Sequence, residues 1–402
     1  QAEDGIRDRD VTGVQTCALP IWGTEAKPDY SYTGWFSMLF AAGMGIGLMF
    51  YGVSEPISHF SSSVADGAGS PESWAPLAGA AGDPAEAHRL GMAATIFHWG
   101  LHPWAIYAVV ALSLALFSYN KGLPLSIRSI FYPTFGERVW GWTGPAIDTL
   151  AVFATLFGLA TSLGIGAEQA IAGLNFLFDI PVTDTSKVVL ISAITVLALV
   201  SVVAGLEAGV KRLSEINMVL AILLLGFVVI VGPTLAIATG FFANLLAYVE
   251  YLPALSNPFG RSDANFSQGW TSFYWAWWIS WSPFVGMFIA RVSKGRTVRE
   301  FLVAVIFVPF LITIGWFSTF GETAIFQFEN GIGDLANGVD DVSLVLFQML
   351  DQMPFAAITS GIAIILVFVF FVTSSDSGSL VIDSITAGGK LHAPVPQRIF
   401  WA

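Results

Sequence analysis

Long apolar runs constrain this chain more than any other feature of its sequence. Eight segments are close to the roughly 20 apolar residues that a helix needs to cross a bilayer, and they lie near 34–53, 91–117, 145–173, 188–207, 216–240, 270–290, 300–320 and 356–382. The chain is 55% hydrophobic and 11% charged, which excludes an ordinary soluble domain. The sequence therefore predicts an all-α polytopic membrane protein with about eight transmembrane helices in a lipid bilayer.

Basic residues are distributed unevenly over the connections between these runs. Four connections carry 11 Lys and Arg residues, whereas the other four carry 3; the basic set comprises 118–144, 208–215, 291–299 and 383–402. The positive-inside rule therefore places the basic set in the cytoplasm and starts the first run inside. Segment 241–256 has the character of a short amphipathic helix lying on the outer surface.

Residues 1–22 differ in character from everything that follows. They have no signal-peptide layout and resemble translated sequencing-adapter read-through, so we interpret them as a non-native scar and expect the membrane domain to comprise residues 23–402. The only cysteine, Cys17, lies in this segment, which excludes thiol catalysis and cysteine metal sites. The net charge of −12 argues against a nucleic-acid partner. No nucleophile–base pair indicates an enzyme.

The sixth run carries the densest aromatic cluster. Four tryptophans fall within seven positions, namely Trp275, Trp277, Trp278 and Trp281. They lie in the middle of the run, whereas membrane aromatics normally collect at headgroup depth. On a helix Trp277, Trp281 and Phe284 align at i, i+4 and i+7. Because ring faces bind cations, we interpret the cluster as a wall for a quaternary ammonium; the alternative is a packed or lipid-facing aromatic face.

Three further runs carry features that are unusual in a membrane helix. Gly43, Gly45 and Gly47 alternate in the first run and weaken helix propensity by roughly 1 kcal/mol each, which predicts an unwound midpoint facing a cavity; the alternative is close helix packing. The second run carries Trp99, Trp104 and Tyr107 on one arc near Pro103. His98 and His102 are spaced for a metal, but no acidic residue accompanies them. The eighth run ends in a polar cluster, a functional candidate by default, comprising residues 373–377.

Pro283 and its serine neighbours interrupt the sixth run, so two interrupted helices lie five runs apart and enter from opposite sides. This arrangement is typical of inverted-repeat transporters with a site between two broken helices. We expect a first repeat over about 34–240 and a partial second repeat over about 270–402. Five runs plus five would make ten, so the second repeat is expected to be truncated.

Four stretches carry a family resemblance: AAGMGIGLMFYGVSEP, FHWGLHPWAIY, FYWAWWISWSPFVGMFIARVSKGRT and FFVTSSDSGS. With these stretches the chain resembles the betaine/carnitine/choline transporters from Gly23 to its C-terminus. The resemblance implies a LeuT-type inverted-repeat core of ten helices preceded by two more, so this chain would lack the first two and last two of twelve spans. It also implies a homotrimer in a bacterial inner membrane.

The resemblance also implies site residues. The aromatic box around a trimethylammonium head would consist of Trp99, Trp104, Tyr107 and Trp278, and the adjoining wall of Trp277, Trp281 and Phe284. A sodium site would use the backbone carbonyls of Ala41, Met44 and Phe370 with the hydroxyls of Thr373 and Ser374, an oxygen cage that suits a hard cation. A second sodium site uses two hydroxyls one turn apart; Thr155 fits, but Leu159 takes the next position, so the chain departs from that pattern.

The glycines Gly43, Gly45 and Gly47 resemble the sodium-coupled betaine branch, since choline members often place an Asp in that stretch. We therefore expect sodium-coupled symport of glycine betaine or a related trimethylammonium osmolyte by alternating access, with sodium as the coupling ion and no organic cofactor. The alternatives are a sodium-independent carnitine/betaine exchanger and a proton-coupled choline transporter. A substrate sensor or a channel without coupled transport is the alternative from a different class.

Overall fold

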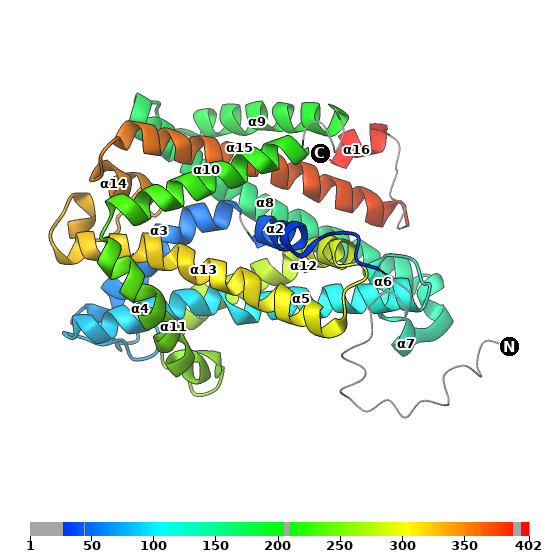
Figure 1. Ribbon diagram of the computed structural model, residues 1–402, viewed down its shortest axis with the longest axis horizontal. Coiled ribbons are helices and arrows are strands. Elements are labelled where there is room, and N and C mark those ends of the chain that lie inside the picture. Colours follow the sequence, from blue (N-terminus) through cyan, green and yellow to red (C-terminus); the bar gives the residue numbers. More distant parts are fainter. Residues whose placement is uncertain (1–26, 44, 205–209, 389–394, 402) are drawn as a thin grey trace.

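The computed structural model describes residues 27–43, 45–204, 210–388 and 395–401, and every regular element in these ranges is a helix (Figure 1). The longer helices are α2 (Tyr32–Gly43), α3 (Ile46–Val64), α4 (Pro84–Trp99), α5 (Leu101–Ala115), α8 (Thr143–Phe178), α9 (Asp184–Ala204), α10 (Val210–Val231), α11 (Thr234–Ser256), α12 (Ser272–Val292), α13 (Val298–Glu329) and α15 (Ala356–Thr386). Short helices are α6 (Ile127–Ile130), α7 (Tyr132–Phe135), α14 (Val345–Asp351) and α16 (Val395–Trp401). The prediction of an all-α polytopic membrane protein is confirmed.

Seven helical segments of the described chain are long and apolar enough to cross a membrane. They include the continuous helices α8, α13 and α15, and the stretch Pro84–Asn120, in which α4 and α5 are followed by a π-helical turn, η1 (Leu116–Asn120). The predicted first and sixth runs are not among the seven. The first is divided between α2 and α3, and the sixth is occupied by the less apolar α12.

The first run is interrupted where its glycines predict. Helix α2 ends at Gly43 and α3 begins at Ile46, with Gly45 in extended backbone before it. Met44 lies outside the described residues. Helix α3 is buried along most of its length and packs against α4, α8 and α13, so the break lies in the interior of the molecule, where bare backbone is tolerated at membrane depth.

The predicted interruption of the sixth run is wrong, because α12 continues from Ser272 to Val292 through Pro283. Pro283 cannot donate a hydrogen bond to the carbonyl of Ile279 four residues earlier. The hydroxyl of Ser282 donates to that carbonyl instead, at 2.8 Å. Side-chain hydroxyls commonly satisfy backbone groups that a membrane proline leaves free, and here one lets the helix continue.

The predicted fifth run, 216–240, is also wrong at its end. Helix α10 ends at Val231, and α11 begins after Gly232 and Pro233, a pair that terminates a helix because proline fixes its φ and lacks an N–H. The amphipathic helix predicted over 241–256 therefore begins at Thr234 and has 23 residues. Although α11 is long enough to span, it runs across the direction of the long helices in Figure 1.

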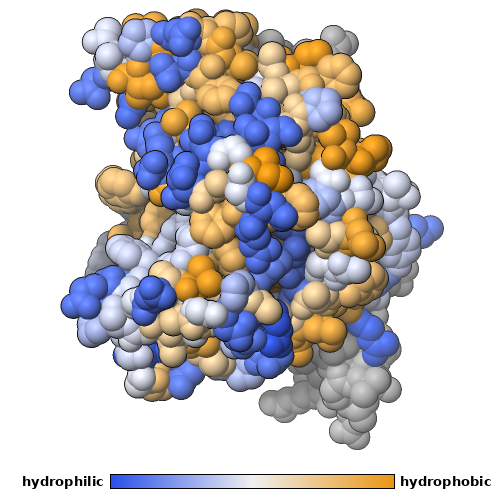
Figure 2. Space-filling model, turned by 90° about the vertical axis from the view of Figure 1, so that its left-hand side faces the viewer, coloured by the Kyte–Doolittle hydropathy of each residue, from blue (hydrophilic) through white to orange (hydrophobic). Residues whose placement is uncertain are grey.

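The two ends of the helical bundle differ. In Figure 1, α14 and the start of α4 lie at one end, and α6, α7 and α16 lie at the other. Figure 2 faces the first end and shows hydrophilic residues across its middle. The charge pattern assigns this end to the outside of the cell.

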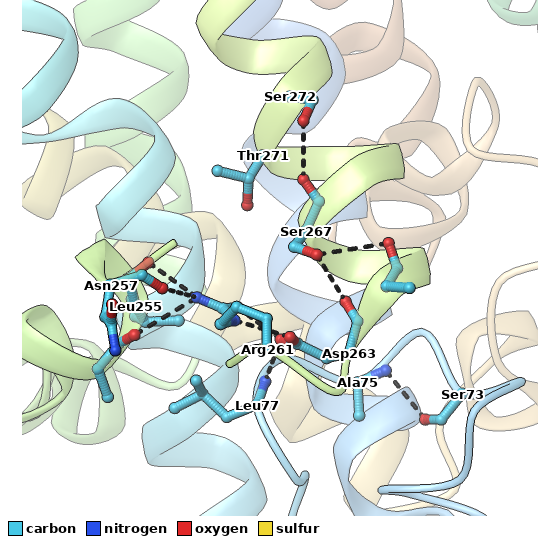
Figure 3. Close-up of polar contacts among 12 residues, drawn as sticks. Ser73, Ala75, Leu77, Leu255, Asn257, Arg261, Asp263, Ser267, Thr271 and Ser272 are labelled. Atoms are coloured by element: carbon cyan, nitrogen blue, oxygen red, sulfur yellow. Dashed lines mark hydrogen bonds and ion pairs between the residues drawn. The ribbon is translucent and has the colours of Figure 1, made fainter. Parts of the chain in front are cut away.

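A polar cluster fixes the chain just before α12 (Figure 3). Arg261 forms an ion pair with Asp263 at 2.5 Å and donates to the carbonyl of Leu255 at 2.9 Å. Asp263 also accepts the backbone N–H of Leu77 at 2.6 Å. This cluster ties the end of α11 to the loop after α3 and leads into a second π-helical turn, η3 (Asn265–Thr271). The start of α12 is thereby positioned against α4.

Candidate functional site

A cavity of about 290 Å³ lies beside Gly45 and the start of α3, just after the glycine break. Segments of α3, α10, α12 and α15 surround it, together with one residue each from α4, α5 and α8. Its lining includes Gly45, Gly47, Trp99, Tyr107, Ser162, Ser214, Asn217, Met218, Trp277, Trp278, Trp281, Phe284, Phe288, Phe370, Thr373, Ser374 and Ser377. None of the described residues that line it is charged. A ligand therefore meets aromatic rings and neutral dipoles.

Three of the four box residues implied by the resemblance line this cavity. The ring centroids of Trp99 and Trp278 lie 5.4 Å apart with planes at 81°, and those of Tyr107 and Trp278 lie 5.1 Å apart at 61°. Steeply inclined rings from α4, α5 and α12 thus meet as adjoining walls. Trp104 does not line the cavity; it is 1% exposed and packs against Tyr107 and Trp278 from behind.

The adjoining aromatic wall also faces the cavity. Trp277, Trp281 and Phe284 all line it, as their helical spacing predicts. The indole N–H of Trp277 donates to Ser162 Oγ, and that of Trp281 donates to the carbonyl of Gly158, both at 2.9 Å. These bonds to α8 fix the rings, and they leave the ring faces, rather than the N–H groups, for a ligand.

The glycines of the break differ in what surrounds them. A Cβ on Gly47 would lie 2.5 Å from Trp99 Cη2 and 2.7 Å from Trp277 Cη2, whereas a Cβ on Gly45 would meet nothing within 4 Å. Gly43 is the last residue of α2. Gly47 is therefore required for the close approach of α3 to the two indoles, in addition to any effect on helix propensity.

Glu55 on α3 is a buried hub that the sequence did not single out. Its Oε2 accepts the indole N–H of Trp99 at 2.8 Å and the hydroxyl of Tyr274 at 2.5 Å. Its Oε1 lies 2.6 Å from His98 Nδ1 and 3.2 Å from His59 Nε2. Through these contacts Glu55 joins α3 to α4 and α12 and holds Trp99 in place. An acidic residue in or beside an apolar run is a functional candidate, and on this ground the sequence alone could have identified Glu55.

The two histidines at metal spacing in the second run do not act together. His98 contacts Glu55 and, through Nε2, Thr271 Oγ1 at 2.9 Å, whereas His102 stacks on Trp275. Glu55, His59 and His98 bring three potential ligand atoms within 4.8 Å of one another. Their mutual hydrogen bonds account for this closeness, so we interpret the cluster as a hydrogen-bonded hub rather than a metal centre.

Three of the five residues implied for the sodium site lie at the α15 side of the cavity. Phe370, Thr373 and Ser374 line it. The hydroxyl of Thr373 donates to the carbonyl of Val369 at 2.9 Å, so its lone pairs remain available to a cation. Ala41 lies in the last turn of α2, where carbonyls lack intrahelical partners, and Met44 lies outside the described residues. The structure thus brings Phe370, Thr373 and Ser374 to one part of the wall, where oxygens of the kind that a hard cation prefers are present.

Thr155, implied for a second sodium site, lies away from the cavity lining. Its hydroxyl donates to the carbonyl of Ala151 at 2.9 Å, and Leu159 in the next turn packs against Gly378. Among the described residues, no hydroxyl one turn after Thr155 completes the pattern.

An aromatic layer separates the central cavity from a second one. Tyr51 contacts Trp99, Tyr274 and Trp277 with ring centroids 5.4–6.2 Å away. On its other side Tyr51 lines a cavity of about 610 Å³ with Ser62, Gly269, Trp270 and Phe273. The charge pattern places this second cavity on the outer side. The central cavity extends instead along α12 to Phe288, toward the cytoplasmic side.

Comparison with known proteins gives a consistent result. The family described as BCCT, betaine/carnitine/choline family transporter, matches residues 18–402. A glycine betaine/proline/choline transporter of Vibrio parahaemolyticus is 67% identical over 95% of this chain and 69% of its own length. Glycine betaine transporter 1 of the same organism is 59% identical over 96% and 72%, respectively. The glycine betaine transporter OpuD of Bacillus subtilis is 45% identical over 94% and 71%.

Proposed function

This chain belongs to the betaine/carnitine/choline transporter family, and we propose that it carries glycine betaine or a related trimethylammonium osmolyte into the cell together with sodium, by alternating access. As a family member it is a transporter rather than an enzyme and a multi-pass protein of the bacterial inner membrane. Glycine betaine is the substrate that the names of the three relatives share, which supports it as the first candidate here.

The observation that carries the proposal is a cavity walled by aromatic rings and free of charged side chains among its described residues. A trimethylammonium group has no N–H to satisfy, and each desolvated cation–π contact contributes on the order of 2 kcal/mol. The rings of Trp99, Tyr107 and Trp278 together offset much of the cost of dehydrating such a group. A wall without a carboxylate favours a net-neutral zwitterion over a net cation such as choline.

A neutral zwitterion gains nothing from the membrane potential, so its accumulation requires a coupled ion. Each sodium that moves inward gains about 2.3 kcal/mol per 100 mV. The hydroxyl oxygens of Thr373 and Ser374 in the cavity wall support sodium as that ion. The second sodium site stays a weaker proposal, because Leu159 takes the place of its other hydroxyl.

The two cavities support alternating access. The aromatic layer around Tyr51 closes the outer side of the central cavity. The lining of the central cavity continues toward the cytoplasmic parts of α12 and α15. Rocking α3 and α12 against α8 and α15 would exchange the open side, the motion expected of inverted-repeat transporters. A homotrimer stays part of the proposal and is tested by the mass of the purified protein–detergent complex.

Radiolabelled glycine betaine uptake into proteoliposomes tests the function. We expect uptake that requires an inward sodium gradient and increases when the interior is made negative, because each cycle moves net positive charge. Equal uptake and counterflow without sodium would instead identify an exchanger. Uptake driven by a proton gradient and preferring choline would identify the choline alternative. Binding without counterflow would identify a sensor.

A further inference from the structure

Asn217 is a buried amide without a hydrogen-bond partner in the wall of the central cavity. Helix α10 presents four residues to the cavity at i, i+3, i+4 and i+7, namely Ser214, Asn217, Met218 and Ala221. The Asn217 side chain is 2% exposed, and neither its Nδ2 nor its Oδ1 has a partner among the described residues. A buried amide that makes no hydrogen bond costs free energy, so a group of this kind in a native wall requires an explanation.

Two other buried polar side chains, one elsewhere in the bundle and one in the same wall, have partners within the chain. Asn244, which is 3% exposed, donates through Nδ2 to Ser318 Oγ at 3.1 Å and to Glu322 Oε1 at 2.7 Å. Ser162, in the wall of the same cavity, donates to the carbonyl of Gly158 and accepts the indole N–H of Trp277. Among the described residues, Asn217 is the only buried amide with neither polar atom paired, and because it lies in the cavity wall, this indicates a ligand that enters the cavity.

The surroundings of Asn217 identify the kind of ligand. Helix α10 packs closely on α15, which contributes Thr373, Ser374 and Ser377 to the same cavity. The hydroxyls of Ser214 and Ser377 take part in no hydrogen bond that joins described residues. Asn217 thus lies at a neutral, oxygen-rich part of the wall, whereas the aromatic box belongs to α4, α5 and α12. Neutral amide and hydroxyl oxygens are ligands for a hard cation.

We propose that Asn217 Oδ1, with the hydroxyls of Ser214 and Ser377, forms a sodium-binding site on the cytoplasmic side of Thr373. Ser214 lies near the start of α10, which the charge pattern places at the cytoplasm, and Ser377 lies one turn beyond Thr373 in the same direction. The ion occupies this site on its way out of the site beside Thr373. The inference rests on the sodium coupling proposed above and adds a further binding site to the path of the sodium ion.

Two near-isosteric substitutions at Asn217 test the site. Glycine betaine binding is followed by tryptophan fluorescence of the purified protein while sodium chloride replaces potassium chloride at constant ionic strength. Asn217→Leu should raise the sodium concentration for half-maximal binding about tenfold or more and leave the glycine betaine Kd at saturating sodium unchanged. Asn217→Asp should lower that sodium concentration below the wild-type value, because a carboxylate is a stronger ligand for a hard cation.

Ile216→Leu is the matched control, since it changes an apolar side chain next to Asn217 that is 49% exposed and lies outside the cavity lining, and it should leave the sodium dependence at the wild-type value. The site is refuted if Asn217→Leu matches wild type in its sodium dependence. A weaker glycine betaine Kd at saturating sodium in Asn217→Leu would also refute it, because the amide would then contact the substrate. Wild-type binding that needs no sodium at all would overturn the proposed coupling itself, and this site with it.

Discussion

Trp278 is the residue on which substrate binding depends most directly. Its ring borders both Trp99 and Tyr107, and its N–H donates to the carbonyl of His98 at 3.0 Å, which fixes the ring. Loss of one cation–π contact of about 2 kcal/mol corresponds to a Kd about 30-fold weaker. We expect Trp278→Leu to weaken glycine betaine binding by at least that factor, as measured by isothermal titration calorimetry.

Trp142 supplies the control for this measurement. It lies before α8 and is 83% exposed, so Trp142→Leu should bind glycine betaine as wild type does. Near-normal binding by Trp278→Leu would contradict the aromatic box.

The glycine break offers a matched pair of substitutions. A methyl group at Gly47 would overlap the indoles of Trp99 and Trp277, whereas one at Gly45 would enter open space, and Gly45 has an extended backbone that alanine adopts readily. We expect Gly47→Ala to displace the two rings and to abolish measurable glycine betaine uptake, and Gly45→Ala to retain it. If both variants transport equally, the break acts through helix propensity alone and the close approach has no role.

At the scale of single residues, sequence patterns located aromatic groups better than polar ones. Trp277, Trp281 and Phe284 share a helical face, and that face alone predicts a common wall. Glu55 and Asn217 are single polar residues in apolar helices, and nothing in their spacing says what they face. Their roles follow from neighbours far away in the sequence, such as Tyr274 for Glu55, and only the fold brings these together.

At the scale of helices, the prediction of a helix break succeeded or failed according to which local groups could satisfy the backbone. The alternating glycines of the first run predicted its break because they remove helix propensity without a compensating group. Pro283 predicted a break that does not occur, because Ser282 satisfies the carbonyl that proline leaves free. Hydropathy could not place the turn between α10 and α11, since the apolar residues continue through Gly232 and Pro233.

The Glu55 hub joins three helices, and its removal should therefore affect stability as well as transport. Glu55→Gln keeps the shape but replaces one acceptor oxygen with an N–H₂ group that faces the donors of Trp99, Tyr274 or His98. A buried donor left without an acceptor costs about 1–3 kcal/mol. We expect Glu55→Gln to lower the free energy of unfolding by an amount in that range and to weaken glycine betaine binding by displacing Trp99.

Thermal and denaturant unfolding in detergent measure the first effect. Glu168→Gln is the matched control, because Glu168 is exposed and pairs with Lys187 at 3.3 Å on the surface; it should change stability by less than about 0.5 kcal/mol. Wild-type stability in Glu55→Gln would mean that the hub contributes nothing to helix packing.

For the whole molecule, the arrangement of the two cavities separates a carrier from a channel. The outer cavity includes Ser62, the central cavity includes Phe288 at its cytoplasmic end, and the aromatic layer around Tyr51 lies between them. The chain has a single cysteine, Cys17, so Cys17→Ser gives a cysteine-free background for Ser62→Cys and Phe288→Cys. A carrier cannot open both sides at once. A ligand that shifts the equilibrium between the outward-open and inward-open states of the carrier must therefore change access to the two positions in opposite directions.

We expect sodium plus glycine betaine to change the rates at which a membrane-impermeant thiol reagent labels Ser62→Cys and Phe288→Cys, and the two changes should have opposite signs. The first variant is labelled in right-side-out vesicles and the second in inside-out vesicles. Ala65→Cys, in the exposed loop after α3, should be labelled at a constant rate and serves as the control. In a channel, one continuous pore would leave both positions open together, and a shared ligand would move both rates the same way. Parallel changes would therefore exclude alternating access, whereas opposite changes would tie the aromatic layer around Tyr51 to the closing of one side as the other opens.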